Sequence, residues 1–376
     1  MSDSSFTEHA ASQPAEGVER MARGHDRRDF LKSVGAVAGT AFLGALQPGG
    51  GLLSAEPQRP CPSPGLVRFG SSDLCVSRYC QGTAFRKLPR TDNPEARKVL
   101  QRCLDVGINF FDSSEAYGWG GSEQVLGKVI AGRRDKVVVC TKVTPSHPPS
   151  NDPDPNKYKV GDTLPLSREV LLQKAEGSLK NLGTHYIDLY LVHNPDEVTP
   201  AADIADSMTT LVRAGKIRYW GVSNHKPEKV AEFHELGKKA GRAPFVGIED
   251  SYNISMRERL EPEMFEVVSR TGIGLLAFSP QDAGKLSSGA VPEAKMVPLV
   301  QAMDKVASEL GATRSQICIA WVLTHPQVTS VLGGAESPGH VEENFGGTLL
   351  KLPPSALATL NAASDAHRQS KLSPKK

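Results

Sequence analysis

The sequence is poor in the features that mark nucleic-acid-binding and zinc-binding proteins. Its formal net charge is only +2 over 376 residues, and no run of basic residues with interleaved aromatics occurs, so we expect no nucleic-acid partner. The six cysteines form no Cys-x-x-Cys pair and have no zinc-ligand spacing. These absences leave a small molecule as the expected partner.

Motifs of several enzyme classes are also missing. No Gly-x-Gly-x-x-Gly follows the first expected strand, which removes the main support for a Rossmann dinucleotide-binding domain. No Gly-x-Ser-x-Gly elbow or His-x-x-Glu-His-type metal site is present, which argues against a hydrolase. The mildly apolar N-terminal stretch, residues 33–46, is too short and too rich in Gly and Ala for a stable membrane span.

We expect residues 1–60 to be a signal and linker. The pattern Arg27-Arg28-Asp29-Phe30-Leu31-Lys32 before the apolar stretch resembles a twin-arginine signal, with a cleavage point after Leu53-Ser54-Ala55. It predicts export by the twin-arginine machinery to the periplasm or another extracytoplasmic space. The alternative is an amphipathic N-terminal helix on a cytoplasmic protein. Residues 57–64 contain four prolines and are expected to be a linker.

The cysteines give two expectations. Cys103, Cys140 and Cys318 fall in apolar helix or strand patterns, which is typical of small buried hydrophobic side chains. Cys75 and Cys80 either bridge in an oxidising compartment or stay reduced. A twin-arginine substrate folds before export, in a reducing compartment, which argues against a disulfide framework.

Short β-branched or aromatic runs alternate with helical patterns from about residue 66. Strands are expected at 78–83, 108–112, 137–142, 187–193, 218–223, 245–249, 274–279 and 328–333. Eight strand–helix alternations favour an α/β fold, the (β/α)8 TIM barrel, over a doubly wound sheet. We assign residues 61–365 to this barrel and residues 366–376 to a polar C-terminal tail.

Helix boundaries are marked by caps and glycines. Asn93-Pro94 opens a helix that Gly107 closes, and Ser167 opens another that Gly183 closes. Two features interrupt the alternation. A segment rich in Pro, Asn and Asp at 145–165 is expected to be a long loop over the barrel mouth, and an extra helix at 315–323 precedes the last strand.

Four polar residues lie at or just beyond the ends of expected strands. Asp112, Lys142 and His193 each follow an apolar run, and Tyr117 lies in the Gly-rich loop after Asp112. A barrel gathers such residues at its C-terminal face, where active sites lie. A free Tyr has a pKa of about 10. An ammonium beside it is expected to lower that pKa, and a carboxylate beyond would keep the Lys charged.

This arrangement is suited to protonating a carbonyl oxygen near neutral pH, with His193 orienting the oxygen or sharing the proton transfer. None of the four side chains can supply a hydride, so a nicotinamide cofactor must carry it. The structural alternatives are an Asp112–Lys142 ion pair, a rim aromatic at Tyr117 and a rim histidine. Four such residues at the correct strand ends favour the catalytic interpretation.

The chain at this point resembles the aldo-keto reductases, from about Val67 to Leu352. Three blocks carry the resemblance, namely 107–118 (GINFFDSSEAYG), 178–193 (SLKNLGTHYIDLYLVH) and 215–224 (GKIRYWGVSN). The resemblance implies that Asp112, Tyr117, Lys142 and His193 form the family's tetrad, with Tyr117 as proton donor. It also implies NADPH or NADH lying over the barrel mouth, without a metal.

By the same resemblance, Ser223 and Asn224 would hold the nicotinamide carboxamide. The third member of that group is normally Gln, but Glu249 occupies its place, and a carboxylate cannot donate to the carboxamide oxygen. The ring that stacks on the nicotinamide is often Tyr and is here Phe278. Ser279 and nearby backbone amides would meet the pyrophosphate.

The adenosine end departs from the family pattern as well. Glu343 and Asn344 would contact adenine, but members that prefer NADP usually carry Lys or Arg around the positions of Glu336 and His340. A carboxylate at 4 Å from a 2′-phosphate is repulsive by ~1 kcal/mol even in high dielectric. The same group could bind a ribose 2′-OH, or point into solvent. We therefore predict weakened NADP selectivity, with NADP or NAD as cofactor.

The leading interpretation is an exported oxidoreductase that reduces aldehydes, ketones or sugar-like carbonyls. A rival interpretation is an exported module that holds a nicotinamide cofactor as a binding protein or sensor and turns over little. Export makes cofactor recycling difficult, because the sequence contains no recognisable electron-transfer module. That difficulty and the altered residues Glu249, Phe278 and Glu336 favour the rival.

Overall fold

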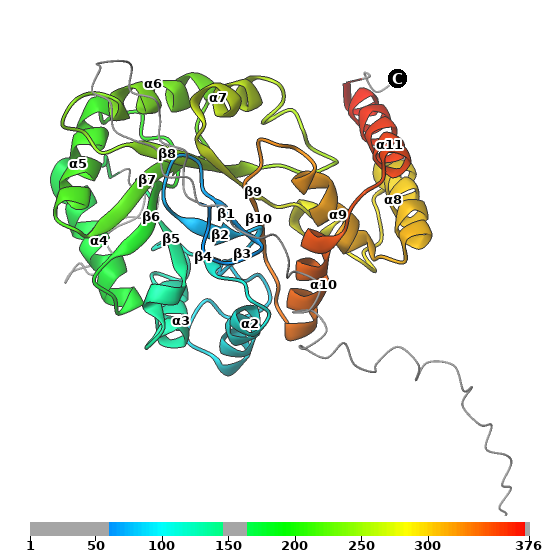
Figure 1. Ribbon diagram of the computed structural model, residues 1–376, viewed down its shortest axis with the longest axis horizontal. Helices are drawn as coiled ribbons and strands as arrows, with labels where there is room; N and C mark the ends of the chain where they lie inside the picture. Colours follow the sequence, from blue (N-terminus) through cyan, green and yellow to red (C-terminus); the bar gives the residue numbers. More distant parts are fainter. Residues whose placement is uncertain (1–59, 146–163, 373–376) are drawn as a thin grey trace, which may run out of the picture. The chain divides into compact units, whose positions relative to one another are not determined.

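A computed structural model describes residues 60–145 and 164–372. Eight parallel strands close into a barrel in the order β10-β3-β4-β5-β6-β7-β8-β9 (Figure 1), and an antiparallel hairpin, β1–β2, precedes them. The strands are β1 Leu66–Arg68, β2 Cys75–Ser77, β3 Tyr79–Gly82, β4 Phe110–Asp112, β5 Val138–Val143, β6 Ile187–Val192, β7 Ile217–Ser223, β8 Phe245–Ser251, β9 Gly274–Phe278 and β10 Ser330–Gly333.

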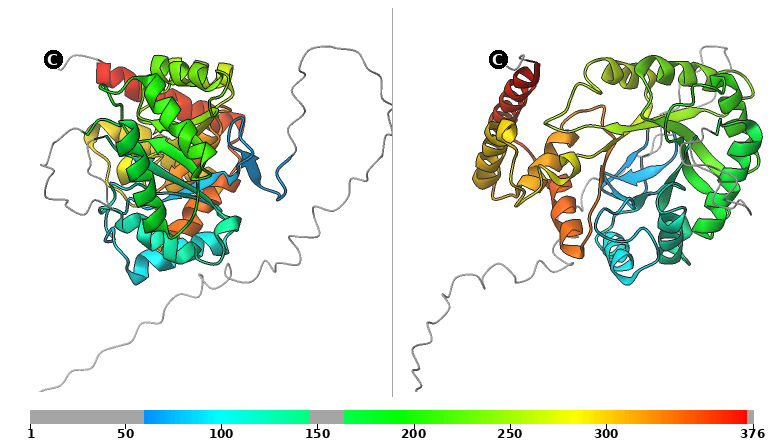
Figure 2. Two further views of the ribbon diagram at one scale, coloured as in Figure 1. Left: turned by 90° about the vertical axis from the view of Figure 1, so that its left-hand side faces the viewer. Right: turned by 180° about the vertical axis from the view of Figure 1, so that it is seen from behind.

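Helices enclose the barrel in both further views (Figure 2). They are α2 Pro94–Asp105, α3 Gly121–Ile130, α4 Arg168–Leu182, α5 Ala201–Arg213, α6 Pro227–Gly237, α7 Glu263–Thr271, α8 Val297–Leu310, α9 Arg314–Leu323, α10 Pro338–Leu349 and α11 Pro354–Leu372. Short 3-10 turns lie at Arg134–Lys136, Asp282–Gly284 and Ala294–Met296. No helix in the described part of the chain is long and apolar enough to cross a membrane.

The TIM barrel predicted from the sequence is confirmed, and each of its eight expected strands is present. The extra helix before the last strand is α9, and the side chains of Asn93 and Ser167 cap α2 and α4 as expected. The export signal with its cleavage point and most of the 145–165 loop lie outside the described residues. The expected tail at 366–376 overlaps the end of α11, which packs beside α8 (Figure 1).

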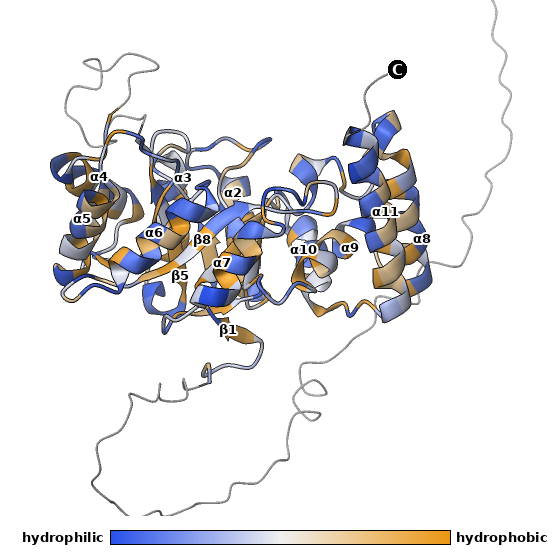
Figure 3. Ribbon diagram, turned by 90° about the horizontal axis from the view of Figure 1, so that it is seen from above, coloured by the Kyte–Doolittle hydropathy of each residue, from blue (hydrophilic) through white to orange (hydrophobic). Residues whose placement is uncertain are grey.

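The barrel helices carry hydrophobic and hydrophilic residues together (Figure 3), as helices with one face on the sheet do. A larger core fills the space between strands and helices. A smaller core fills the barrel itself and includes Phe69, Leu74 and Val76 from the β1–β2 hairpin. The hairpin therefore plugs the N-terminal end of the barrel. Its three-residue strands were too short to be predicted from the sequence.

The disulfide of this region joins Cys61 to Cys75, with 5.7 Å between their Cα atoms. The Cys75–Cys80 bridge, which the sequence left as one alternative, is wrong, because Cys75 pairs with Cys61 instead. Cys75 begins β2 at the edge of the hairpin, whereas Cys80 lies in β3 and is fully buried inside the barrel. Cys103, Cys140 and Cys318 are free and buried, which confirms their assignment as small hydrophobic side chains.

The plug requires glycine at the strand starts that face it. A Cβ added to Gly247 would lie 2.3 Å from Cε1 of Phe69. We expect Gly247→Ala to lower the free energy of unfolding by about 1–3 kcal/mol, the usual cost of overpacking a core. Urea denaturation followed by circular dichroism measures this change. Gly334→Ala is the matched control, because a Cβ there meets no atom within 4 Å. An equal loss of unfolding free energy in both variants would contradict the proposal that Phe69 leaves no room for a side chain at position 247.

Candidate active site

A pocket of about 510 Å³ lies at the C-terminal ends of the barrel strands. Every residue proposed from the sequence lines it except Lys142, whose side chain is fully buried beneath it. The proposed residues that line it are Asp112, Tyr117, His193, Ser223, Asn224, Glu249, Phe278, Ser279, Glu336, His340, Glu343 and Asn344. The structure therefore brings together side chains that lie far apart in the sequence.

Lys142 is the centre of the buried charges. It lies on β5, and its Nζ donates to Oδ1 of Asp112 at 2.5 Å and to the carbonyl oxygen of Ser113 at 3.1 Å. Burial lowers the pKa of Lys142, but Asp112 and Glu249 together outweigh it and raise that pKa well above its usual range. Lys142 therefore carries its proton throughout the physiological pH range.

Tyr117 lies above this lysine. The Lys142 Nζ is 5.4 Å from the centre of the Tyr117 ring, and the ring of His193 meets it edge-on with 5.7 Å between centroids. Burial raises the pKa of Tyr117 above its ordinary value, and Lys142 lowers it only in part. The expectation that the ammonium would lower this pKa overall is therefore wrong, because desolvation of the phenolate is the larger effect.

Two hydroxyls fix the ring of His193. Its Nδ1 lies 2.9 Å from Oγ1 of Thr144 and 3.1 Å from Oγ of Ser114. The main-chain amide of Ala116 also donates to the Ser114 hydroxyl, so that hydroxyl is itself held in place. The imidazole thus keeps one orientation at the pocket wall, beside Tyr117.

A second buried ion pair supports this wall and was missed in the sequence. Lys174 on α4 donates to Oε1 of Glu115 at 2.8 Å and to the carbonyl oxygen of Thr144 at 2.5 Å. Oε1 of Glu115 also accepts from the Thr144 amide at 3.0 Å. Burial raises the pKa of Glu115 to about 7, although Lys174 lowers it. This ion pair could have been suspected from the sequence, because Lys174 interrupts the apolar face of α4.

The strand ends that would meet a nicotinamide are pinned by hydrogen bonds. Asn224 follows β7 in a left-handed conformation, with φ of 61°. Its Nδ2 donates to the carbonyl oxygen of His193 and to Oγ of Ser223, both at 3.0 Å. Ser279, after Phe278, has a φ of 55°. Non-glycine residues in this region are uncommon and often occur at functional sites.

Glu249 is the most unusual residue of the pocket. It lies on β8, is 3% exposed, and its Oε2 is 3.3 Å from Nζ of Lys142. That oxygen makes no hydrogen bond. Burial and the neighbouring Asp112 raise the pKa of Glu249 well above its usual range. In its protonated form Glu249 could donate a hydrogen bond as well as accept one.

Glu336 lines the pocket and is partly buried, and one of its carboxylate oxygens is held by the main chain. Its Oε1 accepts from the main-chain amides of Arg86 and Lys87, the latter at 2.9 Å. This contact could not be predicted from the sequence, because Arg86 and Lys87 lie 250 and 249 positions before Glu336, in the loop after β3. The carboxylate thus joins the loops that follow the neighbouring strands β10 and β3, and Arg86 also donates to the carbonyl oxygen of Ala283 at 3.3 Å.

The remaining residues of this end also have partners. Asn344 donates to the hydroxyl of Tyr79 at 3.0 Å and accepts from Gln281 at 3.0 Å. Ser288 donates to Glu343 at 2.8 Å. His340 is exposed in the first turn of α10, and its amide is capped by Ser337. The sequence did not single out Arg86 or Lys87 as pocket residues, whereas Gln281 and Ser288 lie in the region 281–295 that was expected to line the pocket.

The pocket has the features that a nicotinamide dinucleotide needs. At one end Glu249 lines the cavity, and its buried Oε2 lies 3.3 Å from Nζ of Lys142 and makes no hydrogen bond. At the other end the first turn of α10 and two basic residues, Arg86 and Lys87, line the wall. Helix N-termini and cations both favour phosphate groups. The residues present therefore fit such a cofactor.

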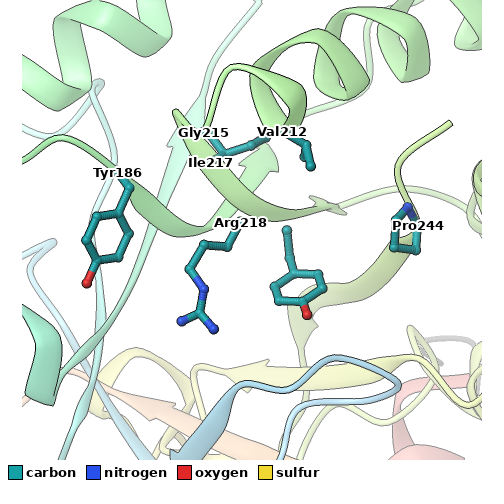
Figure 4. A pocket seen from close by; sticks show the side chains of 7 residues that line it. Tyr186, Val212, Gly215, Ile217, Arg218 and Pro244 are labelled. Carbon is teal, nitrogen blue, oxygen red and sulfur yellow. The ribbon is translucent and has the colours of Figure 1, made fainter. Parts of the chain in front are cut away.

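A second pocket lies at the opposite end of the barrel, beside the starts of β6 and β7 (Figure 4). Tyr186, Val212 and Pro244 give it an apolar lining. Its cation, Arg218, is already paired with Asp188 at 2.7 Å and with Asp73 at 2.8 Å. Since it offers no proton donor beside a free cation, we place the chemistry in the first pocket.

Comparison with known proteins identifies the family of the chain. The model of the aldo/keto reductase family matches residues 80–365. "Uncharacterized oxidoreductase YrpG" of Bacillus subtilis is 32% identical over 319 residues, which cover 78% of this chain and 94% of that protein. A "probable voltage-gated potassium channel subunit beta" of Arabidopsis thaliana is 29% identical over 302 residues, which cover 74% of this chain and 89% of that protein.

A solved structure is similar over the same part of the chain. The crystal structure of a thermostable aldo-keto reductase in complex with the inhibitor epalrestat superposes with a TM-score of 0.66 at 27% identity. The match covers 79% of this chain and 99% of that one. The family model spans most of the sequence, and the barrel and pocket agree with it. This chain therefore belongs to the aldo/keto reductase family.

Proposed function

We propose that this protein is an NAD(P)H-dependent oxidoreductase that reduces aldehyde, ketone or sugar-like carbonyls, with Tyr117 as the proton donor. The observation that carries the proposal is the convergence of Tyr117, His193 and the buried Lys142–Asp112 pair on one pocket. A bound nicotinamide cofactor would supply the hydride. Ser223, Asn224 and Phe278 would hold its ring end, and residues 336–344 its adenosine end.

The side chains around the carbonyl oxygen have distinct tasks. His193, held through Nδ1 by Ser114 and Thr144, orients the oxygen. Tyr117 transfers its proton to that oxygen as hydride reaches the carbon. The raised pKa of Tyr117 keeps the phenol protonated at neutral pH. Lys142 stabilises the phenolate that remains, since an ammonium beside it offsets the negative charge.

The test of the proposal is the oxidation of NADPH or NADH by the purified protein in the presence of a panel of aldehydes, ketones and sugars. Consumption that depends on the carbonyl supports it. Binding of cofactor without turnover of any carbonyl would reject it and favour the second candidate, a cofactor-holding binding or sensor module. The second candidate is supported by the similarity to proteins that are named as potassium channel beta subunits rather than as enzymes.

Cofactor choice gives a separate prediction. Glu336 places a carboxylate at the adenosine end of the pocket, and His340 stands there in place of a Lys or Arg. Arg86 and Lys87 line the same pocket and partly offset that charge. We expect NADP(H) and NAD(H) to bind with dissociation constants less than ~100-fold apart, which corresponds to ~2.7 kcal/mol. Fluorescence titration with the four nucleotides measures the ratio.

Glu336→Gln is the matched variant for this titration. The amide keeps an acceptor for the main-chain groups of Arg86 and Lys87 but removes the charge. It should shift the preference toward NADP(H), because the 2′-phosphate no longer faces a carboxylate. A wild type that prefers NADP(H) by more than ~100-fold would contradict the prediction.

We further propose export by the twin-arginine machinery, on the sequence pattern at 27–32 alone. Cell fractionation of the wild type and of a variant with Arg27 and Arg28 both changed to Lys tests it. Equal distribution of the two proteins between compartments would reject the signal.

A further inference from the structure

Three charged side chains converge under the pocket floor from three strands. Lys142 of β5 lies between Asp112 of β4 and Glu249 of β8, at 2.5 Å from the first carboxylate and 3.3 Å from the second. The exposed fractions of the three side chains are 0%, 2% and 4%. The carboxylates also lie near the thiol of Cys140, within 4.8 Å. The Lys142 ammonium therefore lies between the two carboxylates, where a metal cation would otherwise bind them.

One ammonium cannot neutralise two carboxylates. With all three groups ionised, the buried cluster would carry a net charge of −1, which is costly away from water. Asp112 has the shorter contact with Lys142, which donates a hydrogen bond to its Oδ1. Glu249 has the longer contact, and its Oε2 makes no hydrogen bond. Glu249 is therefore the group that takes up a proton, in accord with its raised pKa.

The other titratable groups facing Glu249 do not change this assignment. Tyr117, Cys80 and Cys140 are buried and neutral in the physiological range, since burial raises the pKa of each. His193, at the end of β6, is turned to the hydroxyls of Ser114 and Thr144.

The neighbouring carboxylate on the same strand has its own partner. Asp250 forms an ion pair with Arg259. Glu249 is thus the neutral acid of this cluster when no further charge is present, and a new positive charge in the pocket would ionise it.

We propose that Glu249 carries a proton when the reduced cofactor is bound and loses it when the oxidised cofactor is bound. The inference rests on the proposed function. Oxidation of a nicotinamide ring adds one positive charge, and Glu249 lines the pocket together with Phe278 and Ser223. A cation near a buried carboxyl favours its ionised form. Gln, the usual residue at this position in the resembling family, cannot respond in this way.

The proton balance of turnover follows. Reduction of a carbonyl moves two electrons as hydride to carbon and one proton to oxygen. Tyr117 gives that proton, and a second proton passes from Glu249 through the Lys142 ammonium to the phenolate, so that Lys142 ends the step with its proton, as it began. The alcohol leaves neutral, and the new carboxylate balances the positive charge of the oxidised ring. The proton is replaced from solvent when the reduced cofactor next binds.

Titration calorimetry of the full wild-type chain tests the proposal, with NADP(H) and NAD(H) as probes. Each nucleotide is titrated at one pH in buffers of different ionisation enthalpy. We expect release of about one proton with either oxidised nucleotide and almost none with the reduced ones. The dissociation constant of the oxidised form should fall by up to ~10-fold per pH unit while Glu249 is neutral in the free protein, by linkage. That of the reduced form should stay nearly constant.

The Glu249→Gln variant should abolish the proton release and the pH dependence, and should weaken oxidised-nucleotide binding by ~10-fold or more. Glu123→Gln is the matched control. Glu123 is also a fully buried carboxyl, but it is bound to Thr141 and Asn181 behind the barrel wall and does not line the pocket. The Glu123→Gln variant should still release the proton when the oxidised nucleotide binds. Its melting temperature shows how the loss of a buried carboxylate affects stability.

Two results would overturn the proposal. One is a wild-type ratio of oxidised to reduced affinity that does not depend on pH, which decides the matter even if the Glu249 variant fails to fold. The other is proton release that persists in Glu249→Gln. Binding of neither redox form would instead reject the proposed function.

Discussion

Replacing Tyr117 by Phe is expected to lower kcat for carbonyl reduction by about 10²–10⁴-fold, the usual contribution of a positioned general acid. The phenol is the acid that lies beside both the Lys142 ammonium and the His193 ring. The cofactor dissociation constant should change little, because the variant keeps the aromatic ring. Steady-state kinetics with a responsive aldehyde, together with fluorescence titration of the cofactor, measure both quantities.

Tyr219→Phe is the control for this change, since Tyr219 lies at the other end of the barrel. Equal rates for the wild type and Tyr117→Phe would remove Tyr117 as donor. The pH profile adds a second check. Burial raises the pKa of Tyr117, so the acid form persists as pH rises. Alcohol oxidation, which needs the phenolate, should therefore accelerate with pH beyond neutrality.

Replacing Lys142 by Met should lower the free energy of unfolding by about 3–5 kcal/mol, the range seen when one partner of a buried ion pair is removed. The reason is specific to this barrel. Asp112 and Glu249 would remain buried together without the ammonium that now lies between them. Urea denaturation near neutral pH measures the loss.

The loss should depend on pH in a defined direction. Without Lys142 the pKa of Glu249, which burial and Asp112 already raise, would lie still further above its value in the unfolded state. Groups of this kind favour folding at low pH, and that contribution is lost as the pH rises through the folded pKa. The variant should therefore approach the wild type in acid. Adding Glu249→Gln should recover part of the loss at neutral pH. A deficit that is the same at all pH values would contradict the charge argument.

The sequence predicted the barrel because each strand is a compact apolar run and most helices end at a glycine or begin at a capping residue. Asn93 and Gly183 are examples, and both cap helices in the structure. The tetrad could be predicted for the same reason. Once the strands are placed, Asp112, Lys142 and His193 fall at the same end of a parallel barrel.

The contacts that the sequence did not predict join residues distant in the chain. The Glu336 carboxylate binds the amides of Arg86 and Lys87, and Lys174 binds Glu115. Neither pair has a local pattern, since each depends on how helices and loops meet after folding. The shift predicted for the pKa of Tyr117 had the wrong sign for a similar reason. A neighbouring charge can be inferred from the order of the residues, but the extent of desolvation cannot.

Because Cys61 and Cys75 form a disulfide, the number of free thiols in this protein depends on the redox conditions of its compartment. The chain has six cysteines, and four of them are buried and free. Bridges of this kind close in oxidising compartments and are rare in reducing ones. A molecule that has stayed in a reducing cytoplasm would thus carry six thiols, and one that has reached an oxidising space would carry four. Alkylation of the unfolded chain followed by mass spectrometry distinguishes the form with six thiols from the form with four.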